Sequence, residues 1–134
     1  MAKVRVLSIK AENRPGALAD LVGLLADKGV NILALSVPET GPEGGDVKVL
    51  AEDPDAAMRV IERGGYSAYF EEALAVALPN RAGEFSEMLA KFAAAGVNVR
   101  YAYVACEKGA KTAVIVLSVS DVSGALDAMK RESS

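Results

Sequence analysis

ENRPGALADLVGLLADKGVNI (residues 12–32) recurs 67 residues later as PNRAGEFSEMLAKFAAAGVNV (residues 79–99). In both copies Asn-Arg-x-Gly precedes an apolar run and Gly-Val-Asn follows it. The apolar positions are spaced i, i+3, i+4, i+7, which predicts one buried face of a helix. They are Leu18, Leu21, Val22 and Leu25 in the first copy, and Phe85, Met88, Leu89 and Phe92 in the second. Since 67 is half of the 134 residues, the sequence predicts two copies of one folding unit.

Strands and a second helix surround each repeated helix. Gly29 and Gly96 can take the left-handed conformation that ends a helix. Asp53 and Asp121 are good N-caps for a second helix, ending near residues 63 and 130. The expected strands span residues 3–11, 31–37, 46–51 and 66–71 in the first half, and 72–78, 98–105 and 112–119 in the second.

The element order predicts an α+β fold of two ferredoxin-like units in tandem. The first unit, residues 1–71, is βαββαβ, and the second, residues 72–134, is βαββα with the last strand missing. Such units form antiparallel sheets with both helices on one face. The missing strand should leave one sheet edge open, and open edges invite pairing. We therefore expect another segment or another chain to cover this edge.

Period-two alternation assigns the strand faces. Residues expected to face the helices are Leu7, Ile9, Val47, Val49, Leu74, Val76, Val114 and Val116. The opposite face is also apolar, with Val4, Val6, Leu33, Leu35, Leu50, Ala75, Ala77, Ile115, Leu117 and Val119. Apolar faces of this size are usually covered, which favours sheet packing within the chain or in a homodimer. The alternative is a one-residue slip in some strands, which would exchange their two faces.

Composition and charge exclude several classes of partner. The net charge is −3 with both signs interspersed, and no basic stripe with aromatic residues indicates nucleic-acid binding. No apolar run approaches the roughly 20 residues of a membrane helix. The first residues lack a signal-peptide core, so we expect a cytoplasmic protein without a membrane partner.

The residue inventory argues against catalysis and metal binding. The chain has no histidine, the commonest general base and metal ligand, and its single cysteine is Cys106. Glu84 and Glu87 lie close together on a predicted helix, where a solvated surface is the simpler interpretation. We expect a protein that is not an enzyme and that holds no cofactor and no metal.

The repeated turn has the chemistry of a small-ligand site. Helix N-termini present unpaired amide groups that suit a carboxylate. Gly16 and Gly83 would let a ligand approach the backbone closely, and the amides of Asn13 and Asn80 can both donate and accept. Together these groups could hold the charged ends of a free amino acid. The alternative is that the asparagines are ordinary turn residues and the arginines are solvated.

NRPGALADLVGLLADKGVNI (residues 13–32) closely resembles the signature of the ACT domain, a small-molecule sensing module, and the similarity extends over both halves. The whole chain resembles small stand-alone proteins with tandem ACT units. The resemblance implies a regulatory role and amino-acid binding at interfaces between paired domains. The ligand-binding residues it implies are Asn13, Arg14, Pro15, Gly16, Asn31 and Ile32, and in the second half Asn80, Arg81, Ala82, Gly83, Asn98 and Val99.

Two departures from the family pattern concern the second half. Ala82 stands where the family has proline, and the last strand is absent. The apolar sheet faces and the open edge favour a homodimer, and the regulatory role would act on a separate enzyme or transporter. The alternative function is a ligand-independent regulatory or structural subunit of a metabolic enzyme complex.

Overall fold

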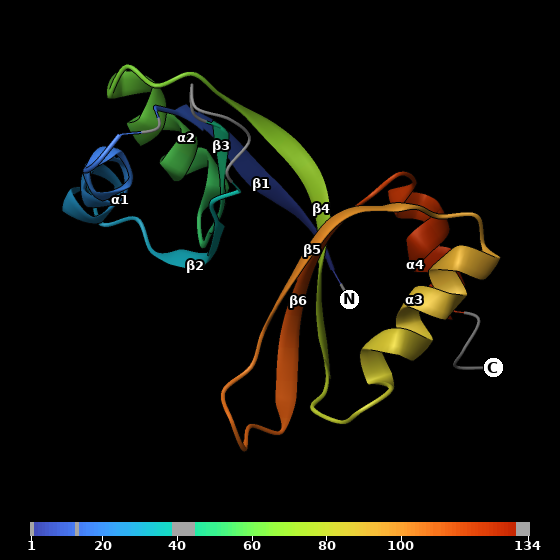
Figure 1. The fold of residues 1–134 in the computed structure, drawn as a ribbon. Helices are drawn as coiled ribbons and strands as arrows, with labels where there is room; N and C mark the ends of the chain where they lie inside the picture. Colours follow the sequence, from blue (N-terminus) through green and yellow to red (C-terminus); the bar gives the residue numbers. More distant parts are fainter. Residues whose placement is uncertain (1, 13, 39–44, 131–134) are drawn as a thin grey trace. The chain divides into compact units, whose positions relative to one another are not determined.

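The computed structural model describes residues 2–12, 14–38 and 45–130, which form four helices and six strands (Figure 1). In chain order the elements are β1 (Ala2–Ala11), α1 (Ala17–Asp27), β2 (Ile32–Ser36), β3 (Gly45–Ala51), α2 (Pro54–Arg63), β4 (Ala68–Pro79), α3 (Glu84–Ala94), β5 (Val99–Ala105), β6 (Thr112–Val119) and α4 (Val122–Lys130). The predicted α+β class and the four helices are confirmed.

The described residues divide into two compact units. The N-terminal unit is Arg5–Glu71, and the C-terminal unit combines residues 2–4 with residues 72–130. The chain passes between them within β1 and within β4, so each of these strands contributes to both units. The sequence predicts one unit over residues 1–71 and a second over residues 72–134. The two divisions share the boundary between residues 71 and 72 and differ in where they assign residues 2–4.

The N-terminal unit is built as its sequence pattern predicts. Its strands follow the order β2-β3-β1-β4, and Leu7 and Ile9 of β1 lie opposite Val49 and Val47 of β3. These four residues form one buried cluster with Leu21, Leu25, Ala57 and Ile61 of α1 and α2. Figure 1 shows both helices beside the strands of this unit. The helix-covered face predicted for this unit is therefore confirmed.

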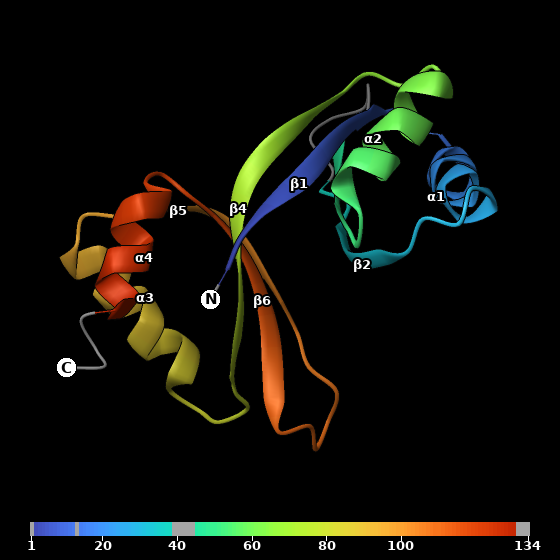
Figure 2. The same cartoon turned by 180° about the vertical axis from the view of Figure 1, so that it is seen from behind.

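The C-terminal unit repeats the arrangement with a one-residue difference from the predicted face. Its strands follow the order β1-β4-β6-β5, and Leu74 and Val76 lie opposite Leu117 and Ile115. Figure 2 shows α3 and α4 side by side in this unit, and they contact one another. The buried cluster contains Leu74, Val76, Met88, Phe92, Val97, Ile115, Leu117, Val119, Ala125 and Ala128.

The predicted face of β6 was therefore wrong. We expected Val114 and Val116 to face the helices, but Ile115 and Leu117 do so, and Val114 is 51% exposed. Every position from Ile115 to Val119 is buried, so the residue types of β6 carry no alternation that could fix its register.

Strand β4 replaces two predicted strands. Residues 66–71 and 72–78 were expected to be separate, but Ala68–Pro79 is one strand because no Gly or Pro interrupts it before Pro79. In the C-terminal unit the beginning of β1 lies beside β4, and Lys3 Nζ is 4.0 Å from Glu72 Oε1. The start of the chain's own first strand, residues 2–4, thus lies beside part of the edge that the sequence left open.

Two further predicted positions differ. Leu18 of α1 is 37% exposed, and Leu24 packs against the core in its place. Leu35 packs on the helix side because the register between β2 and β3 shifts between Ile32 and Ala34. On the face away from the helices, Val6 and Leu50 are buried.

The register of β6 is tested by a pair of truncations. We expect Leu117→Ala to lower the free energy of unfolding by about 2–5 kcal/mol, because it empties part of a close-packed core. Val114→Ala, at an exposed position, should change it by less than about 0.5 kcal/mol. Urea denaturation followed by circular dichroism measures both. Equal effects, or a larger effect for Val114, would contradict the register.

Candidate functional site

The two repeated turns have the same backbone geometry. Gly16 begins α1 with φ 85° and Gly83 begins α3 with φ 93°. The amide of Ala17 donates to the Arg14 carbonyl at 3.2 Å, and the amide of Glu84 donates to the Arg81 carbonyl at 3.3 Å. Positive φ is unfavourable for residues with a Cβ, which explains why both copies carry glycine here.

Neither helix start has a side-chain cap. No side chain accepts a hydrogen bond from the first turn of α1 or of α3 in the described residues. Helix starts leave backbone amides without intrahelical partners, and these amides carry a partial positive charge. Because the first amide of each helix already donates to the arginine carbonyl, a glycine cap leaves the next two amides, at residues 18–19 and 85–86, available to an acceptor from outside the helix.

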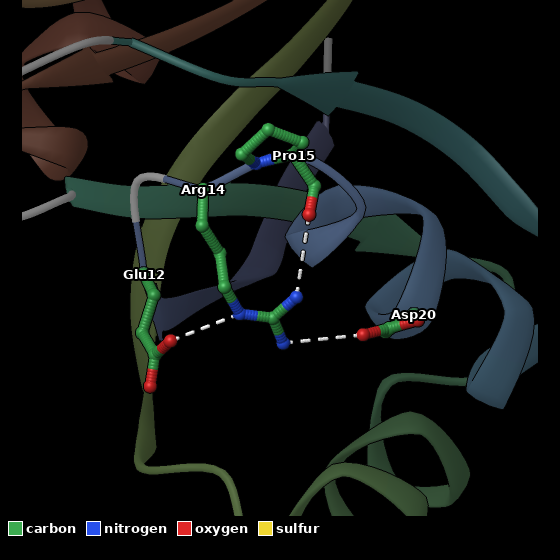
Figure 3. Close-up of polar contacts among 4 residues, drawn as sticks. All are labelled: Glu12, Arg14, Pro15 and Asp20. Atoms are coloured by element: carbon green, nitrogen blue, oxygen red, sulfur yellow. Dashed lines mark hydrogen bonds and ion pairs between the residues drawn. The ribbon is translucent and has the colours of Figure 1, made fainter.

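In the N-terminal unit, Arg14 bridges two carboxylates across the turn (Figure 3). Its Nε donates to Glu12 Oε2 at 3.0 Å, and its Nη2 donates to Asp20 Oδ2 at 3.2 Å. A third, longer bond runs from Nη1 to the Pro15 carbonyl at 3.4 Å. The bonds to Asp20 and Glu12 raise the pKa of Arg14 above its ordinary value.

A cleft of about 360 Å³ lies beside this turn. It is lined by the end of β1, the turn into α1, and the connection from α2 to β4: Lys10, Ala11, Glu12, Arg14, Ala17, Gly64, Gly65, Tyr66 and Ser67. Two of these segments are joined by the amide of Lys10, which donates to the Ser67 carbonyl at 3.0 Å. The cleft therefore lies wholly within the N-terminal unit.

The second turn is tied to its own unit. Asn80 Nδ2 donates to the Ala110 carbonyl at 2.8 Å, and the Asn80 amide donates to the Lys111 carbonyl at 2.9 Å. Arg81 pairs with Glu84, the first residue of α3. The side chain of Asn80 therefore bonds to the connection between β5 and β6. This contact agrees with the alternative that Asn80 is an ordinary turn residue.

The asparagines before the second strands lie far from the turns of their own units. In the N-terminal unit Ala11 lies opposite Gly45, whereas Ile32 lies opposite Ala51, six residues further along β3. At about 3.3 Å per residue this separation is roughly 20 Å. The C-terminal unit repeats it, with Pro79 opposite Thr112 and Val99 opposite Val119.

Asn31 and Asn98 also have local roles. Asn31 Nδ2 donates to Glu52 Oε2 at 3.1 Å, and the Asn98 amide donates to Ser120 Oγ at 2.9 Å. Ile32 and Val99 are half-buried and pack against the cores of their units. The structure therefore does not bring the two groups of predicted site residues together within one unit.

The remaining predicted residues follow the turns. Pro15, Ala82 and Gly83 are exposed, and Asn13 lies outside the described residues. The site residues predicted from the sequence do not include Lys10 or the Gly64-Gly65 pair, which line the cleft. The one sequence signal for this part of the cleft is the double glycine after α2, which indicates a turn without side chains.

The described residues offer no cluster for a metal ion and no helix for a membrane span. Within residues 2–12, 14–38 and 45–130, no group of three acidic or cysteine side chains is arranged to hold a metal ion. No helix of this same part of the chain is both long and apolar enough to cross a bilayer.

Comparison with known proteins identifies the family to which this fold belongs. The family described as an ACT domain pair matches residues 2–126. This chain belongs to that family. No curated protein matches the chain.

Solved structures share the ACT-pair fold. A protein from Bacteroides thetaiotaomicron has a TM-score of 0.90 at 24% identity, over 98% of this chain and 89% of that one. The regulatory subunit of aspartate kinase from Thermus flavus has a TM-score of 0.65 at 17% identity, over 96% and 91%. The ligand-free subunit from Thermus thermophilus has a TM-score of 0.66 at 15% identity, over 96% and 91%. At these identities the likeness establishes the fold.

The need for glycine at position 16 can be tested by comparison with Gly23, which lies inside α1. We expect Gly16→Ala to destabilise the protein by roughly 1–2 kcal/mol, because alanine must take φ near 85°. Gly23→Ala should stabilise it by up to about 1 kcal/mol, since alanine favours a helix and its Cβ meets no atom within 4 Å. Thermal unfolding of both variants distinguishes these signs, and a stable Gly16→Ala protein would contradict the strained turn.

Proposed function

We propose that this ACT pair is a non-catalytic regulatory protein that binds a small ligand, and that the ligand is a free amino acid. The observation that carries the proposal is the duplicated glycine-capped turn in a chain of the ACT domain pair family. The ligand's carboxylate would accept hydrogen bonds from the helix amides. Its readout would be the activity of a separate enzyme in the cytoplasm.

The site is proposed to form between two ACT units. Within one unit the turn and the start of the second strand are roughly 20 Å apart, further than one amino acid spans. A ligand that contacts both must therefore touch the turn of one unit and the strand start of another. The proposal includes a homodimer, in which units of two chains can meet.

Regulation would follow from unequal binding. A ligand held between two units favours the arrangement in which both halves of its site meet, and it shifts the population by the difference in affinity. The proposal gives no residue a catalytic role. At the first turn both carboxylates are paired with Arg14, and the chain contains no histidine to act as a base.

A ligand-independent subunit of a metabolic enzyme complex is the second candidate. The contacts of Asn80 and Arg81 favour it for the second turn, because both side chains are used inside their own unit. Under this alternative the second turn is a structural element only, and the protein acts by binding its enzyme partner.

A thermal-shift screen against the twenty amino acids tests the first proposal. A ligand present at 100 times its dissociation constant adds about 2.7 kcal/mol of stability. This corresponds to a rise of several degrees in melting temperature for a chain of this size. We expect at least one such rise. If no amino acid at millimolar concentration raises the melting temperature, the ligand-independent subunit becomes the favoured function.

Two substitutions at positions far apart within one unit test whether the ligand binds between units. If the site joins the turn of one unit to the strand start of another, Gly16→Val and Asn31→Ala should both weaken the amino acid found in the screen. Gly23→Ala, which lies in α1 beyond the turn, should leave its affinity unchanged. Loss in Gly16→Val alone would place the ligand on one unit and would contradict the interface.

A further inference from the structure

We infer that Lys48 is the centre of a polar lock that holds β4 to the N-terminal unit at the point where the chain leaves that unit. The lock joins β1, β3 and β4 by hydrogen bonds among Ser8, Asp46, Lys48, Tyr69 and Glu71. All five residues belong to the N-terminal unit, and Glu71 is its last residue. The inference does not depend on a ligand or on the proposed function.

The Lys48 ammonium connects the outer two strands of the lock across the strand between them. On β3, Lys48 lies directly opposite Ser8 of β1, and its Nζ donates to Ser8 Oγ at 2.9 Å. The same Nζ donates to Glu71 Oε2 of β4 at 3.4 Å. Since β1 lies between β3 and β4 in the sheet, the small Ser8 side chain lets the longer lysine reach Glu71.

Asp46 makes a second connection among the same three strands. Ser8 Oγ donates to Asp46 Oδ2 at 3.1 Å, and the Tyr69 hydroxyl donates to the same oxygen at 3.3 Å. The Lys48 ammonium also lies 5.8 Å from the centre of the Tyr69 ring, within the range of a cation–π attraction. Strand β4 is thus held at two residues of one face, Tyr69 and Glu71.

Partial burial strengthens the contact between Lys48 and Glu71. Ser8 is 1% exposed, and the side chains of Lys48 and Glu71 are 12% and 23% exposed. Salt and water screen such a pair less than a surface pair. Separating it would leave two partly buried charges with less compensation, which is costly. The first part of β4 therefore keeps its place in the sheet of the N-terminal unit.

The positions of the lock on β1 and β3 are apolar in the second copy of the unit. By the repeat offset and the strand registers, Ser8, Asp46 and Lys48 correspond to Ala75, Val114 and Val116. Both copies form a buried core, so the fold itself does not require charges at these positions. The charges occur in the copy whose last strand, β4, continues beyond the unit.

Amide hydrogen exchange of the full-length protein, followed residue by residue by NMR, tests the lock. We expect Lys48→Met to accelerate exchange at residues 69–72 about tenfold or more, through loss of charge-assisted hydrogen bonds. The amides of α3, α4 and β6 should keep the rates of the unaltered protein, because a local opening leaves distant elements closed.

Arg5→Met is the matched control on the other face of β4. The Arg5 guanidinium lies 4.5 Å from the centre of the Phe70 ring, and its Nη1 is 3.1 Å from Asp55 Oδ1. The side chains of Arg5 and Asp55 are 45% and 61% exposed, and exposed ion pairs contribute little. This substitution should therefore change exchange at residues 69–72 by about fivefold at most.

A variant with the residues of the second copy separates a lock from a general stabilising contact. It combines Ser8→Ala, Asp46→Val and Lys48→Val. Because apolar replacement of buried ion pairs is often neutral or stabilising, we expect its melting temperature to be unchanged or raised. Exchange at residues 69–72 should nevertheless rise about tenfold or more.

Two results would overturn the inference. One is unchanged exchange at residues 69–72 in Lys48→Met, and the other is acceleration by the same factor at every protected amide, which would indicate a loss of global stability only. If the triple variant does not fold, Lys48→Met decides alone, with Arg5→Met as its control.

Discussion

The positive φ of the glycine before each first helix is the constraint on which the rest of each unit depends. It turns the chain from the end of a strand into a helix within five residues at Gly16 and within four at Gly83. The turn fixes which face of the helix meets the sheet and leaves the first amides without a side-chain cap. The same turn therefore determines the fold and, under the proposed function, the contacts to the ligand.

The two copies keep this constraint and the Asn-Arg pair before it, and they differ in the residues that pack and pair around it. Both retain a buried cluster between two helices and a sheet, although the residues in it differ. The Asn-Arg pair before the glycine is the same in both turns, but the arginines have different partners. Arg14 bridges Glu12 and Asp20 beside a cleft, whereas Arg81 pairs with Glu84. The two units thus share the backbone of the turn and differ in the contacts of its side chains.

The sequence predicted what depends on local pattern. Helix spacing and β alternation predicted the four helices and the N-terminal core, and the resemblance of residues 13–32 predicted the ACT family; all three are confirmed. It failed where the pattern carries no information. Strand β6 is buried along most of its length, so its face could not be read, and nothing in the residues around Glu71 marks where one unit gives way to the other within β4. The cleft was missed because Lys10 and Ser67 are 57 residues apart and meet only through strand pairing.

The contacts at the first turn are weak, which favours the proposed sensing role. A site built from buried, fully paired charges would be rigid, and a ligand would have to break strong interactions to enter. The pairs around Arg14 are exposed, so each contributes little to stability and each can be replaced by a ligand group of the same charge. Under the proposed function, binding would exchange one set of ion pairs for another, and the net free energy would be the small difference between them. Such a balance would give reversible occupancy that follows the concentration of a metabolite, as the proposed regulatory role requires.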